Sequence, residues 1–249
     1  GQYMNQMRVH LKTTIEKLER SNAQLESFAF IASHDLQEPL KKICLYSDLL
    51  EKENKSNMTN QSLSYVTKLK NLSAHMSQLI HDVLEYSRLK QNGLYKNVDI
   101  QKVIDDALKN LKQEIQKTNA QILMDKDLPQ VLGISHHLTQ LFENLIDNAL
   151  KFHKKGIPPK IMIKAQLIDP QSVEVQISDE GIGFDMKHAK KIVKPFQKLH
   201  SQREYMGTGV GLAICKRIAE IHNSQLKIES EPGIGSTFSI ALQKLPLEP

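Results

Sequence analysis

Tryptophan is absent from this sequence, and the other aromatic residues are few. Aromatic side chains make up 5% of the 249 residues, and only two cysteines, Cys44 and Cys215, are present. A low aromatic content favours long helices over a sandwich of aromatic-rich strands. The two cysteines lie far apart and form no metal-type pair, which is typical of unpaired thiols in a reducing compartment.

Long apolar runs are missing as well. No stretch approaches the length of a membrane span and no signal peptide opens the chain, so we expect a cytoplasmic fragment without membrane contact. The net charge is only +5, and Lys and Arg alternate with Asp and Glu. A nucleic-acid-binding protein more often shows a basic stripe or a base-reading motif, and neither is present. Nucleic acid is therefore not an expected partner.

The N-terminal part predicts one long helix from about Met4 to Glu53. Apolar residues recur every seven positions, and a companion series containing the polar Asn22 falls three residues earlier. A heptad seam with Asn22 as its register-fixing polar residue predicts a parallel two-stranded coiled coil, and a single amphipathic surface helix is the alternative. The two series are Met4, Leu11, Leu18, Leu25 and Ala32, and Arg8, Ile15, Asn22, Ala29 and Leu36.

A second helix follows the polar stretch at residues 54–60, and Asn92-Gly93 marks its end. Two long helices joined by a short polar turn predict an antiparallel hairpin. A single hairpin cannot cover both apolar stripes, so burial predicts a homodimer whose two hairpins form a four-helix bundle. The apolar residues of the second helix alternate at spacings of three and four: Leu69, Leu72, Met76, Leu79, Val83 and Tyr86.

Beyond residue 92 the pattern changes to mixed α and β. We therefore expect two domains, a helical one over residues 1–92 and an α/β sandwich over residues 93–249. Helices are expected at about Ile100–Thr118, Ser135–His153 and Val210–His222. Strands are expected at Ala120–Met124, Lys160–Ile168, Ser172–Ser178, Gln225–Ser230 and Ser236–Leu242, with a hairpin at residues 232–235.

Two groups of residues in the second domain suggest a nucleotide site. Asn144, Asn148 and Lys151 align on one face of a predicted helix, where carboxamide oxygens suit Mg²⁺ and an ammonium group complements polyphosphate. Asp179 ends a strand and precedes two glycines, so its carboxylate can accept a hydrogen bond from an exocyclic amine while the backbone closes on a flat ring. Taken alone, the helix face is better explained as a solvated polar stripe. The Asp179 segment alone is equally compatible with a tight turn that Asp anchors.

The third group is Gly207-Thr208-Gly209-Val210-Gly211-Leu212, which opens a predicted helix. Glycines let consecutive amides converge on a phosphate, and the helix N-terminus adds its dipole. Leu212 and Ile214 occupy the positions where a dinucleotide-binding fingerprint would have its third glycine, and the preceding residues, Phe196 to Met206, are polar and lid-like. A Walker P-loop, a protein-kinase glycine-rich loop, a zinc motif and a nucleophile elbow are all absent.

Together these segments resemble the N box, first glycine box, F box and second glycine box of histidine kinases, in the family's order. Histidine kinases share these boxes with the gyrase, Hsp90 and MutL ATPases. A further segment, Ser33-His34-Asp35-Leu36-Gln37-Glu38-Pro39-Leu40, resembles the phosphoacceptor H box. Its residues are similar to those of the phytochrome-type subgroup of histidine kinases. The resemblance spans about Ser21 to Leu242 and rests on the boxes Asn144-Leu-Ile-Asp-Asn148-Ala-Leu-Lys151-Phe152, Asp179-x-Gly181-x-Gly183, Pro195-Phe196 and Gly207-x-Gly209-x-Gly211-Leu212.

The resemblance implies that the second domain binds ATP with Mg²⁺. Asn148 would be the Mg²⁺ ligand, with Asn144 assisting through water. Lys151 would contact phosphate and Asp179 the adenine amine. Gly207, Gly209 and Gly211 would form a lid hinge and supply phosphate-binding amides, and Lys198 and Arg203 are candidates for the γ-phosphate. The other nucleotide-binding candidates are Phe152, Gly181, Gly183, Phe196, Thr208, Val210 and Leu212.

His34 is the candidate phosphoacceptor because it stands beside Asp35 and before Pro39 on a helix expected to be dimeric. A neutral imidazole nitrogen can attack a γ-phosphorus while a carboxylate receives the proton of the other nitrogen. Pro39 cannot donate to the Asp35 carbonyl, so we expect a bend just beyond the acceptor. The other histidines are assigned to surface or packing roles: His10, His75, His81, His136, His137, His153, His188, His200 and His222.

Glu38 stands one helical turn after His34, where many such kinases carry Thr or Asn. In the family, the residue at that position helps to orient the water that dephosphorylates the response regulator. We therefore expect Glu38 to make this protein a poor phosphatase of its regulator. The leading interpretation is a dimeric ATP:protein-histidine phosphotransferase with a response-regulator receiver domain as partner and a sensor domain upstream. The alternatives are a scaffold switched by ATP binding and a coiled-coil interaction module whose second domain binds an unrelated ligand.

Overall fold

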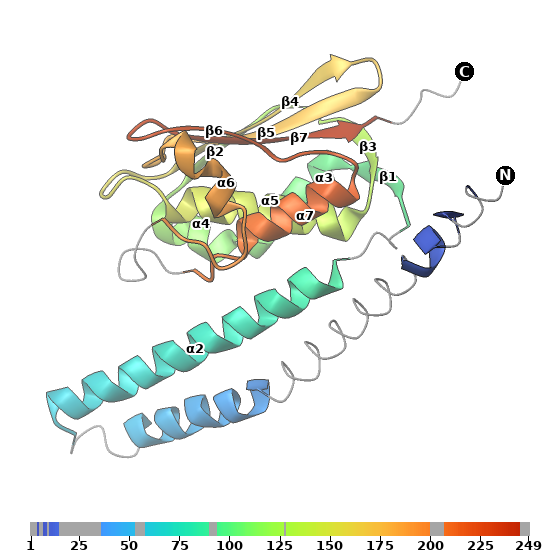
Figure 1. Ribbon diagram of the computed structural model, residues 1–249. Helices are drawn as coiled ribbons and strands as arrows, with labels where there is room; N and C mark the ends of the chain where they lie inside the picture. Colours follow the sequence, from blue (N-terminus) through green and yellow to red (C-terminus); the bar gives the residue numbers. More distant parts are fainter. Residues whose placement is uncertain are drawn as a thin grey trace. The chain divides into compact units, whose positions relative to one another are not determined.

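The computed structural model describes residues 4, 7, 8, 10–14, 36–52, 58–89, 94–126, 128–199 and 207–244. The chain divides into two compact units, Gly1–Arg88 and Leu89–Pro249 (Figure 1). We take the units one at a time. None of the helices in the described part is long and apolar enough to span a bilayer.

The first unit contains the two helices expected of a hairpin. Residues 36–52 form one helix and α2, Asn60–Arg88, forms the other. Residues 4, 7, 8 and 10–14 are also helical. The rest of the predicted N-terminal helix, with most of its heptad seam, lies outside the described residues. The predicted end of the second helix at Asn92-Gly93 was late, because α2 ends at Arg88.

Lys70 joins the two helices of the first unit. Its Nζ lies 2.7 Å from Asp48 Oδ1 and 2.9 Å from Glu51 Oε2. The two carboxylates raise the pKa of Lys70 above its ordinary value. A single lysine between two carboxylates of the facing helix fixes the register of the hairpin.

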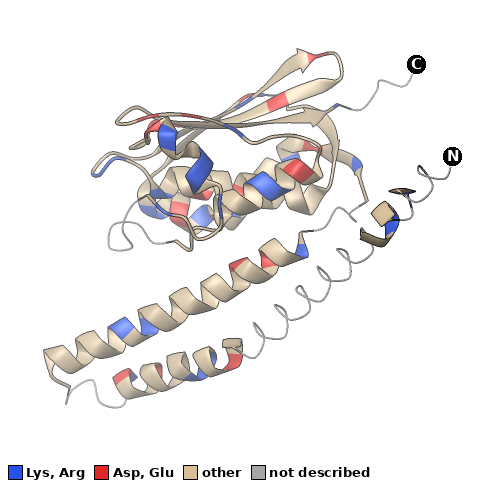
Figure 2. Ribbon diagram, viewed as in Figure 1, with Lys and Arg blue, Asp and Glu red and all other residues tan. Residues whose placement is uncertain are grey.

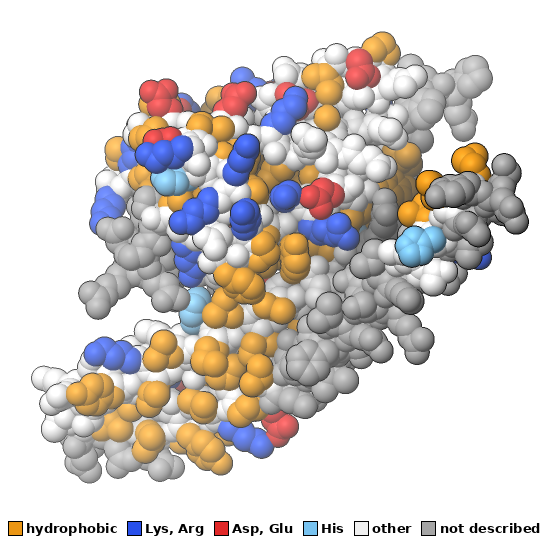
Figure 3. Space-filling model, in the orientation of Figure 1, with side chains coloured by type: hydrophobic (Ala, Val, Ile, Leu, Met, Phe, Trp, Pro, Cys, Tyr) orange, Lys and Arg blue, Asp and Glu red, His pale blue; other side chains and the backbone are white. Residues whose placement is uncertain are grey.

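Many apolar side chains of the first unit remain exposed. Leu69, Leu72 and Met76 of α2 are 48%, 60% and 48% exposed. The helix of residues 36–52 shows the same feature at Leu36, Ile43, Tyr46, Leu49 and Leu50. Figure 3 shows hydrophobic side chains gathered on the surface of these helices. The hairpin therefore leaves uncovered a large part of the stripe that its sequence predicts as buried.

The second unit is an α/β sandwich built on a five-stranded sheet of order β2-β4-β5-β7-β6. β2 pairs in parallel with β4 and the other neighbours are antiparallel. The helices lie along one face of the sheet (Figure 1). The strands are β2 (Gln121–Met124), β4 (Lys160–Asp169), β5 (Ser172–Asp179), β6 (Lys227–Glu231) and β7 (Gly235–Gln243).

The core of this unit lies between the sheet and its helices. The helices are α3 (Ile100–Asn110), α4 (Lys112–Thr118), α5 (Ser135–Lys151), the short η1 (Met186–His188) and α6 (Ala189–Ile192), and α7 (Gly211–Ile221). The apolar face predicted for α5 is buried as expected: Leu138, Leu141, Phe142, Leu145 and Ala149. Asn144 of α5 lies beside Gly211 at the start of α7.

Two features of the second unit differ from the prediction. The helix expected over Ile100–Thr118 is two helices, broken at Leu111, where the backbone leaves helical geometry and the side chain is buried. The break lets both segments direct apolar residues to one core. A small antiparallel pair, β1 (Lys96–Asp99) with β3 (Gln130–Gly133), was not predicted. Four-residue strands show too little alternation to be recognised.

Candidate functional site

The helix α5 places the predicted nucleotide residues along one line. Asn144 and Asn148 lie one turn apart and are partly buried, and α5 ends at Lys151. Its C-cap residue, Phe152, accepts a hydrogen bond from Ile182 N at 2.9 Å through its carbonyl oxygen. The C-terminal end of α5 is thereby joined to the glycine turn that follows Asp179.

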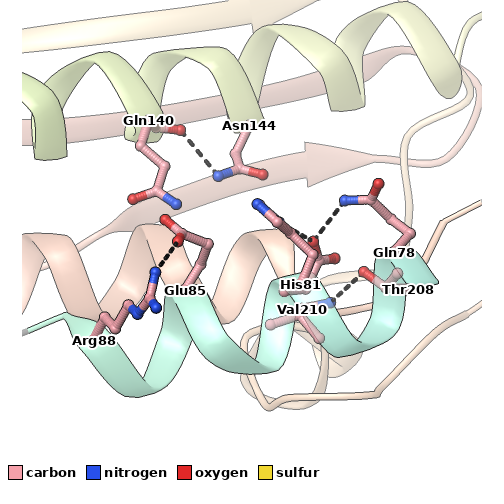
Figure 4. A network of polar contacts seen from close by, with 9 residues as sticks. Gln78, His81, Glu85, Arg88, Gln140, Asn144, Thr208 and Val210 are labelled. Atoms are coloured by element: carbon pink, nitrogen blue, oxygen red, sulfur yellow. Dashed lines mark hydrogen bonds and ion pairs between the residues drawn. The ribbon is translucent and has the colours of Figure 1, made fainter. Parts of the chain in front are cut away.

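Asn144 lies against the second glycine turn. Its Nδ2 donates to the Gln140 carbonyl at 2.9 Å, and a Cβ added to Gly211 would lie 2.8 Å from its Oδ1 (Figure 4). The amide is therefore turned so that its oxygen faces the start of α7. Because Gly211 has no side chain, Asn144 Oδ1 can occupy this position without a steric clash.

Asn148 and Lys151 differ in how their polar groups are satisfied. Asn148 Nδ2 is buried and has no hydrogen-bond partner within the described residues. Lys151 Nζ is bonded to Asp147 Oδ2, one turn earlier on α5. A buried amide without a partner is costly unless a ligand completes it. To contact a phosphate, the Lys151 ammonium group would have to break its ion pair with Asp147 or bind both groups at once.

Asp179 ends β5 in the first glycine turn. Its Oδ1 accepts from Gly181 N at 2.8 Å. Burial raises the pKa of Asp179 to about 6, although hydrogen bonds from the backbone at Gly181 and Ser236 and the charge of Lys154 oppose the rise. A carboxylate kept away from water in this way retains a strong tendency to accept a hydrogen bond from a ligand.

The glycines of this turn are required by close backbone approaches. A Cβ on Gly181 would lie 2.4 Å from the Phe152 carbonyl oxygen, and one on Gly183, whose φ is +56°, would lie 2.0 Å from the Glu231 carbonyl oxygen. Only glycine permits both contacts. The turn is therefore held between the end of α5 and the hairpin of β6 and β7.

The second glycine turn is tied to the F box. Phe196 N donates to the Gly209 carbonyl at 2.9 Å, and Lys198 Nζ donates to the Gly207 carbonyl. Phe196 has φ +64° and is 56% exposed, an unfavourable conformation for a bulky residue. Thr208 and Val210 are buried, and Leu212 is partly buried on α7. Arg203 lies outside the described residues.

Positive charge is concentrated in the segment that links the two glycine turns. Exposed lysines occur on and around η1 and α6, at Lys187, Lys190, Lys191 and Lys194, and Figure 2 shows blue, basic positions on α6. The expectation of alternating charges was therefore wrong for this segment.

The family models match both parts of the chain. Residues 133–247 match the model "Histidine kinase-, DNA gyrase B-, and HSP90-like ATPase", and residues 24–92 match the "His Kinase A (phospho-acceptor) domain". Cyanobacterial phytochrome A of Nostoc sp. is 41% identical over 222 residues, which are 89% of this chain and 29% of that protein. Phytochrome-like protein Cph1 of Synechocystis sp. is 41% identical over 226 residues, or 90% of this chain and 30% of that protein.

This chain belongs to the histidine kinases. It spans about 30% of the length of the phytochrome relatives that it matches. Among solved structures, the kinase is similar to full-length ShkA in complex with AMPPNP, with a TM-score of 0.68 and 24% identity over 89% of this chain and 47% of that one. A solved chain of the mycobacterial sensor histidine kinase MprB is similar with a TM-score of 0.54 and 25% identity over 62% of this chain and all of that solved chain.

The phosphoacceptor residues of the kinase are placed only in part. His34 and Asp35 lie outside the described residues, so the expected bend before Pro39 does too. Glu38 is described, and its Oε1 lies 2.7 Å from Lys42 Nζ on the same exposed helix face. Lys42 thus partly neutralises the charge on which the phosphatase hypothesis depends.

Tyr95, His137 and His222 form a polar cluster in the second unit, and no local sequence pattern assigns it a role. These aromatic rings lie near one another, with His222 5.4 Å from Tyr95 and 6.2 Å from His137 between ring centroids. Burial, together with the neighbouring His136 and His222, lowers the pKa of His137 to about 4. No local pattern could have identified the cluster, because its members are far apart in sequence and come from three different segments.

Proposed function

We propose that the chain binds Mg·ATP in its C-terminal unit and transfers the γ-phosphoryl group to His34. The observation that carries the proposal is the arrangement around α5. One helix sets Asn144 against Gly211 of the second glycine turn and Phe152 against Gly181 of the first. Helix α5 and the two glycine turns are separate in sequence but lie together in the fold. They carry the residues that we expect to hold the two ends of one nucleotide.

The residues present fit the nucleotide. Asn144 turns its oxygen toward the glycine turn, and the buried Nδ2 of Asn148 has no partner among the described residues. Carboxamide side chains such as these also carry neutral oxygens, which suit Mg²⁺. The AMPPNP in the related ShkA structure is consistent with this site. When bound, Mg²⁺ would neutralise phosphate charge and orient the triphosphate.

Each end of the nucleotide has its own residues in this assignment. Asp179 accepts from the adenine amine, while the amides of Gly209 and Gly211 and the N-terminal end of α7 face the phosphates. Lys198 and Arg203 are assigned to the γ-phosphate. Lys198 would then exchange the Gly207 carbonyl for phosphate oxygen.

At His34, one neutral imidazole nitrogen attacks the γ-phosphorus while Asp35 receives the proton of the other nitrogen. A nitrogen–phosphorus bond forms, the bond from the γ-phosphorus to the bridging oxygen breaks, and ADP leaves. The acceptor of the next transfer would be an aspartate in a receiver domain. The exposed apolar face of the hairpin supports the proposal that the protein is a homodimer. We also propose that it is cytoplasmic and that a sensor domain precedes it in the full-length protein.

Transfer of labelled γ-phosphate to the chain tests the function. We expect acid-labile label on the wild type and none on His34→Gln or Asn148→Asp. Asn119→Asp is the matched control, since Asn119 is exposed at the C-terminal end of α4 in a conformation that aspartate also adopts. Binding of Mg·ATP by the wild type without any labelling would favour the alternative of a nucleotide-switched scaffold.

The part played by Glu38 is a separate proposal. Its charge would oppose the acidic site of a phosphorylated receiver domain, so the wild type should dephosphorylate that domain slowly. Glu38→Thr should accelerate the decay. Equally fast decay with both proteins would refute the role of Glu38 and leave the kinase assignment untouched.

A further inference from the structure

The C-terminal end of α7 carries hydrogen bonds that the proposed chemistry does not use. His222, the C-cap residue of α7, is buried and bonded on both sides of its ring. Its Nδ1 lies 2.8 Å from the Ile218 carbonyl oxygen, and its Nε2 accepts from Ile134 N at 3.0 Å. Ile134 is the N-cap residue of α5. One imidazole thus joins the end of α7 to the start of α5.

These two bonds define the tautomer of His222. A backbone N–H only donates, so Nε2 must carry the lone pair, and Nδ1 must carry the proton that the Ile218 carbonyl accepts. Burial lowers the pKa of His222, which keeps the ring neutral. Gly133 leaves room for this arrangement, because a Cβ there would lie 3.2 Å from Nε2 and 2.9 Å from Leu138 Cδ1.

Tyr95 adds a connection from another segment. Its hydroxyl donates to the carbonyl oxygen of Ile221, the last residue of α7, and its ring packs against His222. Tyr95 is the residue directly before β1. The start of β1 is therefore attached to the same end of α7 that His222 attaches to α5.

The other end of α7 is the second glycine turn. α7 has 11 residues and is therefore about 16 Å long. Along this length it contacts α5 again, through Cys215 Sγ at 3.6 Å from the Leu141 carbonyl oxygen and through Gly211 beside Asn144. A packed helix moves as one body, so its position at residues 221–222 determines where the glycine turn stands relative to Asn144.

We propose that His222 and Tyr95 are positioning residues for the nucleotide. His222 sets α7 against α5, and Tyr95 attaches the start of β1 to the same end of α7. The inference rests on the proposed nucleotide site and extends it. Displacement of this end of α7 would move the phosphate-binding turn, although neither side chain belongs to the proposed nucleotide contacts.

Three substitutions separate positioning from general stability. Tyr95→Phe removes one hydroxyl and keeps the ring against His222. His222→Leu leaves Ile134 N without its acceptor, whereas His222→Gln offers a side-chain oxygen in its place. Tyr65→Phe is the matched control, because Tyr65 is exposed on α2 and its hydroxyl accepts a hydrogen bond from Gln61 Nε2 on the surface.

The readouts are the affinity for a nonhydrolysable Mg·ATP analogue at pH 8 and amide hydrogen exchange in the nucleotide-free protein. We expect Tyr95→Phe and His222→Leu to weaken binding by about threefold to thirtyfold and to accelerate exchange at residues 207–214. His222→Gln should recover most of the affinity. Tyr65→Phe should behave as the wild type.

A purely structural role would give a different pattern. Tyr95→Phe would then lower the melting temperature while affinity and exchange at the glycine turn stayed as in the wild type, and this result would overturn the inference. If His222→Leu fails to fold, the affinities and exchange rates of Tyr95→Phe and His222→Gln still distinguish a positioning role from a purely structural one. Failure of the wild type to bind the analogue would instead refute the nucleotide site itself.

Discussion

Asp179 shows how a single residue combines recognition with a cost in stability. Its carboxyl group is largely buried between the first glycine turn and β7, and burial raises its pKa from 3.8 to about 6. The folded state therefore disfavours the ionised form. That penalty is fully present above pH 6 and disappears as the pH falls toward 3.8, where the folded and unfolded proteins both bind the proton.

Asp179→Asn should therefore stabilise the nucleotide-free protein while it abolishes nucleotide binding. Near pH 8 the gain should be ~3 kcal/mol in the free energy of unfolding, which is the rise of the pKa from 3.8 to about 6 converted to energy, and it should shrink as the pH falls from 6 to 4. Thermal unfolding between pH 4 and pH 8 measures it. A destabilised variant, or a gain that does not depend on pH, would contradict the assigned environment.

Gly211→Ala should separate affinity from stability in another way. The added Cβ would lie 2.8 Å from Asn144 Oδ1, so the asparagine must turn away, and we expect Mg·ATP binding to weaken by about tenfold or more. Stability should hardly change, because alanine suits the first turn of a helix.

Gly207→Ala is the control for that substitution. A Cβ on Gly207 would meet no atom of the described residues within 4 Å, so titration calorimetry should find nearly wild-type affinity. Equal losses for the two alanine variants would show that flexibility of the turn, rather than the space beside Asn144, governs binding.

Candidate site residues could be selected from the sequence where they belong to a local motif. Contacts between distant residues could not be predicted in this way. The sequence identified Asn144, Asp179 and Gly211 because their spacing is local. It could not show that Lys151 is paired with Asp147 or that Lys198 is bonded to Gly207, since alternative partners compete for a lysine. His222 was assigned to packing, and only the fold shows which two helices it joins.

At the scale of elements, the exposed face of the hairpin is the feature that most needs a partner. Leu69, Leu72 and Met76 continue the apolar spacing of α2 yet remain exposed in a single chain. A contiguous apolar face of this kind marks an interface. The heptad pattern and the exposed face support the same expectation of a second copy.

Leu72→Lys should weaken that dimer. Burial of an unpaired ammonium group on each copy costs several kcal/mol, so the dissociation constant should rise by roughly 100-fold or more. Sedimentation analysis measures it. Asn71→Lys adds the same charge at the neighbouring exposed position and should leave the dimer intact; similar dissociation of both variants would place the interface elsewhere.

Regular elements were predicted well and irregular ones were not. The bounds of α5, β4 and β5 agree with their apolar patterns to within two residues. The break at Leu111 was missed because a buried leucine continues the helical spacing while its backbone departs from it. β1 and β3 were missed because four residues carry too little pattern, and their pairing is long-range.

At the scale of the whole molecule, the chain is a helical hairpin unit joined to a nucleotide-binding unit. The family models assign one to the phosphoacceptor and the other to the ATPase class. The expected domain limits of 1–92 and 93–249 remain a proposal beside the structural division at Arg88 and Leu89. Within the second unit, Tyr95 attaches the start of β1 to the end of α7.

The central claim is that the nucleotide held by the second unit phosphorylates His34. The most direct measurement is to incubate the protein with Mg·ATP, digest it under alkaline conditions and locate the phosphate by tandem mass spectrometry. We predict one phosphate, on His34, absent from Asn148→Asp and present in Asn119→Asp. Phosphate on Ser33 or another residue, or an unmodified His34 in protein that demonstrably binds Mg·ATP, would contradict the account.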